Sequence, residues 1–151
     1  MNRSFHIRPA KKQDMPQVHQ LIRELAIYEK EEHQLTNTVE QLIRDGFSDP
    51  PLFSCIVAEK KEQIVGFALF YTSYSTWKGK SLYLEDLLVT EAERRSEIGT
   101  ALFDELLKIA RSNGAKRFEW QVLDWNEPAI NFYKKYKANL DPNWINGKII
   151  L

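Results

Sequence analysis

The sequence predicts an α/β fold, with a central mixed β-sheet flanked by helices. Some segments repeat apolar residues at helical spacing, whereas others are short apolar runs rich in aromatic and β-branched side chains. These segments alternate in the order β-α-α-β-β-β-α-β-α-β, which is typical neither of a helical bundle nor of a β-sandwich. The chain has 151 residues, of which 43% are hydrophobic. We therefore expect a single domain over residues 1–151.

The first part of the chain predicts a strand followed by a helix. Residues 4–8 are expected to form the strand. Asp14 and Gln17 have the spacing of a capping box at a helix start. Pro16 suits the first turn of the same helix, which should run to about Glu31.

A second helix and a β-hairpin are expected next. Thr38 and Gln41 repeat the capping-box spacing and predict a shorter helix. Residues 53–58 and 64–74 are apolar runs rich in strand-forming residues, with charged residues between them. Together they predict a hairpin that turns at residues 59–63.

The second half of the chain predicts a strand–helix–strand crossover. The helical period returns over residues 97–113, between strands expected at 82–90 and 117–123. Such a crossover joins parallel strands, so parallel pairing is predicted here. Asn126 should cap a further short helix, and residues 144–151 are expected to form a last strand.

Composition excludes several classes of protein. Lys and Arg number 21, as do Asp and Glu, and this balance argues against a nucleic-acid binder. The single cysteine, Cys55, cannot form an internal disulfide, and we interpret it as a small buried hydrophobe. The three histidines lack metal-ligand spacing, so no metal is expected. Apolar runs are too short to cross a bilayer, and we expect a cytoplasmic protein without membrane contact.

The turn before the helix at 97–113 is a candidate anion site. In open α/β sheets, ligands bind at the carboxyl ends of strands, which here directs attention to residues 85–100 and 121–133. A helix N-terminus with Arg94 and Arg95 beside it suits a phosphate group. The same residues are also compatible with an ordinary turn that carries solvated arginines.

Longer motifs resemble a known family. Leu82-Tyr-Leu-Glu-Asp86 and Trp125-Asn-Glu-Pro-Ala-Ile-Asn-Phe-Tyr-Lys134 are the most specific, and matching pieces extend from about Ile7 to Trp144. In these motifs the chain resembles the GNAT N-acetyltransferases, and within them the diamine/polyamine (spermidine/spermine-type) branch. The resemblance implies the GNAT acyl-CoA N-acyltransferase fold, acetyl-CoA as co-substrate and a homodimer.

The resemblance also implies roles for individual residues. Tyr133 would protonate the departing thiolate, and Glu85 would take the proton of the amine through water. The amine site would comprise Glu85 together with Tyr28, Glu29, Trp77 and Trp120. Acetyl-CoA would be bound by two groups of residues: Leu87, Leu88, Val89, Arg94, Arg95, Ser96, Glu97, Ile98, Gly99 and Thr100, and then Asn126, Pro128 and Ala129.

The chemistry of amine acetylation needs these residue types. An alkyl ammonium has a pKa of about 10.4, so only roughly one molecule in a few thousand is neutral at pH 7. Only the neutral amine can attack a thioester. A carboxylate that binds the ammonium and relays its proton away supplies the neutral amine that the reaction needs. A tyrosine can supply a proton to the thiolate. Two substrates held together also gain from proximity, so direct transfer in a ternary complex is expected.

The sequence departs from the family at two places. Arg95 and Glu97 stand where the polyamine branch has the first two glycines of Arg-Gly-x-Gly-Ile-Gly, so weaker acetyl-CoA binding is expected. No acid lies between Tyr74 and Trp77, which favours a diamine or a thialysine- or lysine-like amino acid over a long polyamine. A catalytically impaired binding module and an enzyme for protein lysines remain alternatives.

Overall fold

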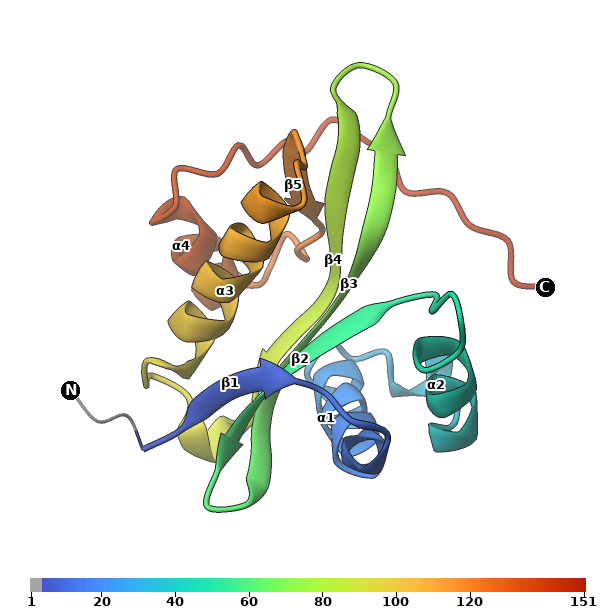
Figure 1. Cartoon of the computed structure of the whole chain (residues 1–151). Coiled ribbons are helices and arrows are strands. Elements are labelled where there is room, and N and C mark those ends of the chain that lie inside the picture. Colours follow the sequence, from blue (N-terminus) through green and yellow to red (C-terminus); the bar gives the residue numbers. More distant parts are fainter. Residues whose placement is uncertain (1–3) are drawn as a thin grey trace. The chain divides into compact units, whose positions relative to one another are not determined.

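The computed structural model describes residues 4–151 (Figure 1). The chain divides into two compact units, and the boundary in the sequence falls between Gln121 and Val122. The strands of the first unit are β1 (His6–Pro9), β2 (Ser54–Lys60), β3 (Gln63–Ser75), β4 (Gly79–Val89) and β5 (Arg117–Trp120). Its helices are α1 (Met15–Tyr28), α2 (Val39–Gly46) and α3 (Ile98–Ser112), with short 3₁₀ turns η1 (Lys12–Asp14), η2 (Glu32–Gln34) and η3 (Glu91–Glu93). The second unit contains α4 (Glu127–Lys134).

The five strands form one mixed sheet in the order β1-β2-β3-β4-β5. The first four strands pair antiparallel, whereas β4 and β5 pair parallel across the α3 crossover. The predicted α/β class, the hairpin and the parallel crossover are therefore confirmed. At the hairpin turn, Lys61 and Glu62 both have positive φ, as a two-residue turn with the twist of the strands requires.

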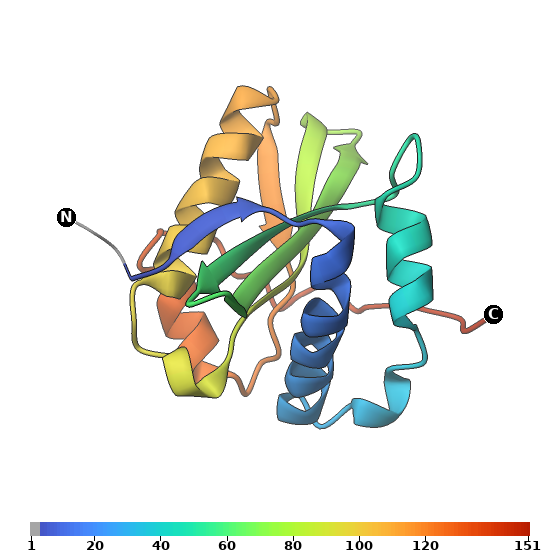
Figure 2. The ribbon, with the colours of Figure 1, turned by 60° about the horizontal axis from the view of Figure 1, so that its bottom comes forward.

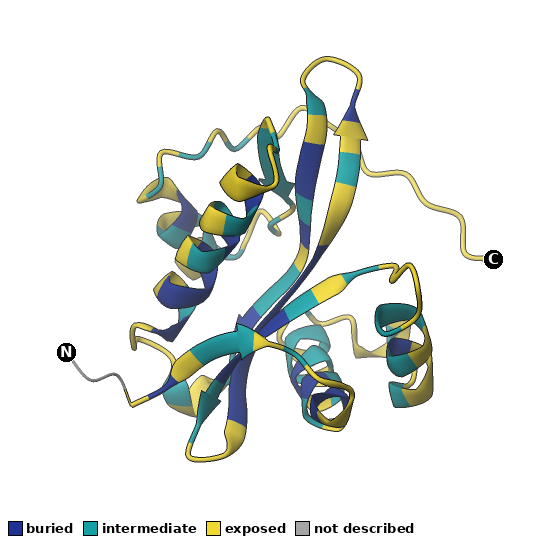
Figure 3. Cartoon of the chain, viewed as in Figure 1, coloured by how far each residue is buried: buried dark blue, intermediate teal, exposed yellow. Residues whose placement is uncertain are grey.

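Helices cover both faces of the sheet in the first unit. Met15 and Val18 of α1 are fully buried in a cluster with Phe67 and Leu69 of β3. Gly66 of β3 faces α3 instead, and a Cβ there would lie 3.2 Å from the Leu102 side chain. The views agree that α1 and α2 lie on one face and α3 on the other (Figures 1 and 2), with the buried positions on the sides that meet the sheet (Figure 3).

The capping box predicted at the start of α1 is wrong. The Asp14 carboxylate accepts hydrogen bonds from Arg8 (2.7 and 3.0 Å) and from the Lys11 N–H (2.7 Å). Gln17 Oε1 accepts from the Ile64 N–H at 3.0 Å instead of reaching back to the helix start. Asp14 and Gln17 therefore do not form the capping box with each other. Their side chains instead satisfy the partly buried Arg8 guanidinium and the partly buried Ile64 N–H.

The capping residues predicted for α2 and α4 both bond as N-caps. Thr38 Oγ1 accepts from the Gln41 N–H at 3.1 Å, and Asn126 Oδ1 accepts from the Ala129 N–H at 3.3 Å. Cys55 packs against the main core cluster, and burial raises the pKa of its thiol to about 12. These contacts agree with the roles that the local sequence predicts.

The last predicted strand does not form. Residues 144–151 have no regular structure, and Trp144, Ile145, Ile149, Ile150 and Leu151 are exposed. A strand needs a neighbouring strand to satisfy its backbone groups. In the described second unit α4 is the only helix or strand, so the apolar pattern alone cannot produce one.

Two features are absent from residues 4–151. No helix there is both long and apolar enough to span a bilayer. No group of three or more His, Cys, Asp or Glu side chains there is arranged to hold a metal ion.

The Arg8–Asp14 pair should contribute strongly to stability. Asp14 is 5% exposed, and Arg8 also bonds Glu59 at 2.7 Å. Asp14→Ala would leave a partly buried cation without its main partner, so we expect a loss of about 3 kcal/mol in the free energy of unfolding by urea titration. Asp104→Ala, at an exposed position of α3, should change it by less than about 0.5 kcal/mol.

The stability lost in Asp14→Ala should also depend on pH. The hydrogen bond from Arg8 lowers the pKa of Asp14 below its ordinary value of 3.8. The stabilisation is therefore complete above the unfolded pKa and disappears as the pH falls through the lower folded pKa. A difference between wild type and Asp14→Ala that stays constant below pH 3.8 would contradict this account.

Candidate active site

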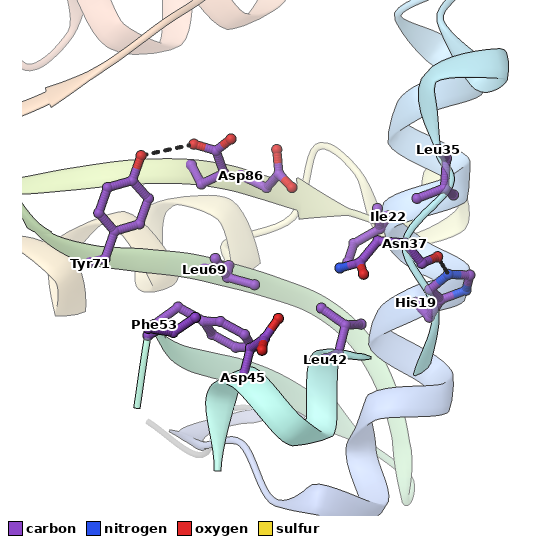
Figure 4. A pocket seen from close by; sticks show the side chains of 12 residues that line it. His19, Ile22, Leu35, Asn37, Leu42, Asp45, Phe53, Leu69, Tyr71 and Asp86 are labelled. Carbon is purple, nitrogen blue, oxygen red and sulfur yellow. Dashed lines mark hydrogen bonds between the residues drawn. The ribbon is translucent and has the colours of Figure 1, made fainter. Parts of the chain in front are cut away.

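A pocket of about 330 Å³ opens on the face of the sheet that α1 and α2 cover (Figure 4). Its walls come from α1, α2, the segments that follow them, and strands β3 and β4. The lining residues are His19, Ile22, Leu35, Asn37, Leu42, Asp45, Leu52, Phe53, Leu69, Tyr71, Glu85 and Asp86. The pocket thus combines an apolar wall with three carboxylates.

An irregularity in β4 places two consecutive acids on this pocket. Leu84 pairs with Phe70 and Asp86 pairs with Leu69, so Glu85 is an extra residue in the ladder. Consecutive residues of a regular strand point to opposite faces, but a β-bulge interrupts that alternation. Glu85 and Asp86 consequently both line the pocket.

The Asp86 side chain is half-buried and lies near the acids Glu85 and Glu29. Burial, followed by repulsion from Glu85 and Glu29, raises its pKa to about 7. None of the described residues donates a hydrogen bond to it. Such a carboxyl gains stability in its charged form when a cation enters the pocket.

Tyr71 borders the same acids on β3. Its hydroxyl donates to Glu85 Oε2 at 3.4 Å, and its ring stacks on that of Tyr83 with centroids 5.3 Å apart. Burial, with the negative charge of Glu85, raises the pKa of Tyr71 to about 12. Tyr71 therefore stays protonated and orients the Glu85 carboxylate.

The predicted cofactor strand has one open edge. Pairing between β4 and β5 ends at Leu84 and Trp120. Beyond that point, Leu87–Val89 pairs with β3 on one side, and no described strand pairs with it on the other. Free peptide groups at this edge fit the amide groups of a pantetheine arm, and the nearby N-terminus of α3 fits a pyrophosphate.

The turn between β4 and α3 is tied to α1 by Glu24. The Glu24 carboxylate accepts from the Thr90 hydroxyl at 3.0 Å and from the Glu91 N–H at 2.9 Å. Arg94 donates to Val89 O at 2.9 Å, reaches Glu24 at 3.4 Å, and lies 5.3 Å from the centre of the Tyr28 ring. Arg94, predicted to contact the cofactor, therefore contacts α1 in this structure.

The two residues that replace family glycines differ in backbone conformation. Arg95 has φ +64°, the left-handed region that favours glycine. Glu97 has φ −79° and ψ −1°, which any residue adopts, and its side chain is exposed. Only Arg95 is strained by the substitution.

The other predicted amine-site residues lie outside the lining of the pocket. Tyr28 and Glu29 are at the end of α1, where the negative charge of Glu29 reaches Asp86. Burial, followed by the charge of Glu31, raises the pKa of Glu29. Trp77 is 80% exposed in the β3–β4 hairpin, and Trp120 at the end of β5 packs edge-on against Phe103.

The remaining predicted residues belong to the second unit. Asn126 caps α4, and Pro128 and Ala129 form its first turn. Tyr133 is buried within α4, and its ring lies 5.4 Å from that of Phe132. These residues share one helix, and their roles in binding and catalysis stay predictions.

Of the lining residues, only Glu85 was assigned to the site from the sequence, so its polar neighbours Asp45, Tyr71 and Asp86 were missed. For Asp86 a signal was available, because two adjacent acids are unusual within an apolar strand. For Asp45 the signal was the acidic excess of residues 24–45, six acids against two bases, which suits either a cationic substrate or a solvated helix face. Tyr71 gave no signal, since it reaches the pocket through the packing of separate elements.

The left-handed conformation of Arg95 makes a stability prediction. Arg95→Gly removes a strain of about 1–2 kcal/mol but adds freedom to the unfolded chain worth about 0.5–1 kcal/mol. We therefore expect the free energy of unfolding to rise by about 0.5 kcal/mol. The matched variant Glu97→Gly relieves no strain, so its free energy of unfolding should fall. Changes of the same sign in both urea titrations would contradict the assignment.

Comparisons with known proteins identify the family of the chain. The model of the acetyltransferase (GNAT) family matches residues 15–137. The thialysine N-epsilon-acetyltransferase of Mus musculus is 40% identical over 139 residues, which is 87% of this chain and 82% of that one. The spermidine/spermine N(1)-acetyltransferase-like protein 1 of Homo sapiens is 40% identical over 85% of this chain and 20% of its own length.

The fold also matches a solved structure. An aminoglycoside acetyltransferase from an uncultured soil metagenomic sample superposes with a TM-score of 0.79 at 21% identity, covering 97% of this chain and 96% of that one. At this identity the likeness supports the fold alone. The family match covers most of the chain, and the mouse relative aligns over most of its own length. The chain therefore belongs to the GNAT family and is an N-acetyltransferase.

Proposed function

We propose that this protein transfers the acetyl group of acetyl-CoA directly to a small primary amine bound in the pocket described above. The observation that carries the proposal is the pair Glu85 and Asp86, which the bulge in β4 sets side by side on the pocket. The open edge of Leu87–Val89 follows them directly on the same strand. Amine and thioester sites would thus share one strand.

The carboxylates would bind the amine and prepare it for attack. The ammonium form enters an acidic pocket, and its positive charge favours ionised Asp86. Glu85, oriented by Tyr71, would then take the ammonium proton through water. The neutral nitrogen left behind is the nucleophile, and general base catalysis of this kind typically contributes about 10²–10⁴-fold in rate.

The open edge of β4 and the turn before α3 would hold the co-substrate. When bound, acetyl-CoA supplies the activated acetyl group as a thioester. Peptide groups of Leu87–Val89 would bond its pantetheine arm, and the turn 94–100 would bind its pyrophosphate. By the resemblance, Asn126 with Pro128 and Ala129 would contact the arm, and Tyr133 would donate a proton to the leaving sulfur.

The structure weighs against the impaired binding module. That alternative rests on Arg95 and Glu97, but Glu97 has ordinary backbone geometry and an exposed side chain. Transfer to a protein lysine is also less favoured, because the pocket has the volume of a small-molecule site. A homodimer and a cytoplasmic location are further proposals, which rest on the resemblance and on composition.

The experiment that tests the function combines binding and turnover. Wild type should bind acetyl-CoA in calorimetric titration and release free CoA when a small primary amine is added. Glu85→Gln and Tyr133→Phe should each lower kcat about 10²–10⁴-fold while leaving the Kd for acetyl-CoA unchanged. Glu40→Gln, an exposed acid of α2, is the control and should keep wild-type kcat.

Two results would contradict the proposal. If Glu85→Gln kept the wild-type kcat, Glu85 would not be the general base. Failure of wild type to bind acetyl-CoA, with binding restored in Glu97→Gly, would establish the impaired module instead.

The contacts of Glu24 predict a selective kinetic effect. Glu24 bonds three groups of the turn that precedes α3, and it is remote in sequence from the acids of β4. Losing these charge-assisted bonds in Glu24→Ala should raise the KM for acetyl-CoA about tenfold, with kcat within about twofold. Glu24→Gln keeps one acceptor oxygen and should be intermediate. A rise in the KM for the amine alone would contradict this role.

A further inference from the structure

The side of the pocket opposite β4 carries a third carboxylate, Asp45. We propose that Asp45 holds the second ammonium group of a diamine, so that the pocket selects a dication over a lysine-like amino acid. This inference rests on the proposed function, because it takes the pocket as the amine site. Figure 4 shows the Asp45 side chain across the pocket from Asp86, with Leu69 between them.

Asp45 is available to a ligand. It lies in the last turn of α2, where the partial negative charge of the helix end also favours a cation. Its backbone oxygen accepts from the Leu52 N–H at 2.8 Å. Its carboxylate accepts no hydrogen bond from any described residue, and the neighbouring Arg44 donates to Gln41 instead.

The charges of the lining favour two cationic groups and no anion. Asp45, Glu85 and Asp86 contribute three carboxylates, and the lining contains no lysine or arginine. His19 is its one basic side chain, and His19 Nε2 lies 2.8 Å from the Asn37 backbone oxygen. The α-carboxylate of an amino acid would therefore enter without a cationic partner and close to like charges.

A second observation concerns Asp86. Its side chain is half-buried, lines the pocket and has no hydrogen-bond donor among the described residues. A carboxylate that is partly withdrawn from water and has no donor gains a partner when a cationic ligand binds beside it. An ammonium near Glu85 and Asp86 and another at Asp45 would satisfy both sides.

The wall between the two acidic sides suits an alkyl chain. Leu69 lies between Asp45 and the acids of β4, Leu42 and Phe53 flank Asp45, and all three line the pocket (Figure 4). Methylene groups gain free energy when they leave water for such a surface. The arrangement of acid, apolar wall and acid thus matches ammonium, methylene chain and ammonium.

The test compares two substrates that differ by one carboxylate. Lysine is 1,5-diaminopentane with a carboxylate on one terminal carbon. We expect kcat/KM for the diamine to exceed that for lysine by at least about tenfold in an assay of CoA release. In Asp45→Asn, the KM for the diamine should rise about tenfold, whereas kcat/KM for 1-aminopentane should stay within about twofold. Glu40→Gln on the same helix is the matched control and should preserve every value.

Each outcome decides one of the two proposals. Equal or greater efficiency with lysine would overturn the selection of a dication while leaving the acetyltransferase function intact. An equal loss for diamine and monoamine in Asp45→Asn would assign Asp45 a structural role instead. Acetyl-CoA binding without acetylation of any of these amines would overturn the proposed function itself. If Asp45→Asn fails to fold, the wild-type comparison of lysine and diamine still decides the matter.

Discussion

The pocket depends on one extra residue in β4. Without the bulge at Glu85, that residue and Asp86 would point to opposite faces, and one carboxylate would lie under α3 among apolar side chains. The bulge instead directs both acids to the face covered by α1 and α2. Burial and, second to it, the charge of Glu85 raise the pKa of Asp86, so keeping both carboxyls ionised costs free energy. A site that binds cations recovers this cost when its ligand arrives.

The same strand connects this acidic pocket to the open edge. Up to Leu84, β4 is held between two neighbours, and beyond it only β3 remains paired. The bulge and the end of the β5 pairing thus coincide within two residues. The part of β4 that follows Leu84 thus offers ligands both the side chains of Glu85 and Asp86 and the free peptide groups of its open edge.

The turn before α3 shows how a departure from a family pattern can be tolerated. Arg95 adopts the left-handed backbone conformation that a glycine would adopt more easily, so its substitution strains the turn without reshaping it. Bonds from Thr90, Glu91 and Arg94 to Glu24 hold the flanking residues. Tertiary contacts therefore maintain a geometry that the local sequence disfavours.

Local patterns were sufficient for most of the fold. Apolar spacing, the caps at Thr38 and Asn126 and the run of strand residues each act within a few positions, so the sequence alone determines them. The motif around Glu85 and Asp86 was also enough to indicate the family. The last strand failed because an apolar pattern cannot supply the neighbour that a strand requires.

Tertiary structure alone decided which partners the polar side chains take. Gln17 bonds a residue 47 positions away, and Arg94 reaches one 70 positions away. Asp45 likewise lines the same pocket as Glu85 and Asp86 only because α2 packs on the face of the sheet where those two acids lie. Hydrogen bonds and charges act through space, whereas periodicity and capping act along the chain. The sequence by itself therefore determined the elements and the family, and the packing of those elements determined the site.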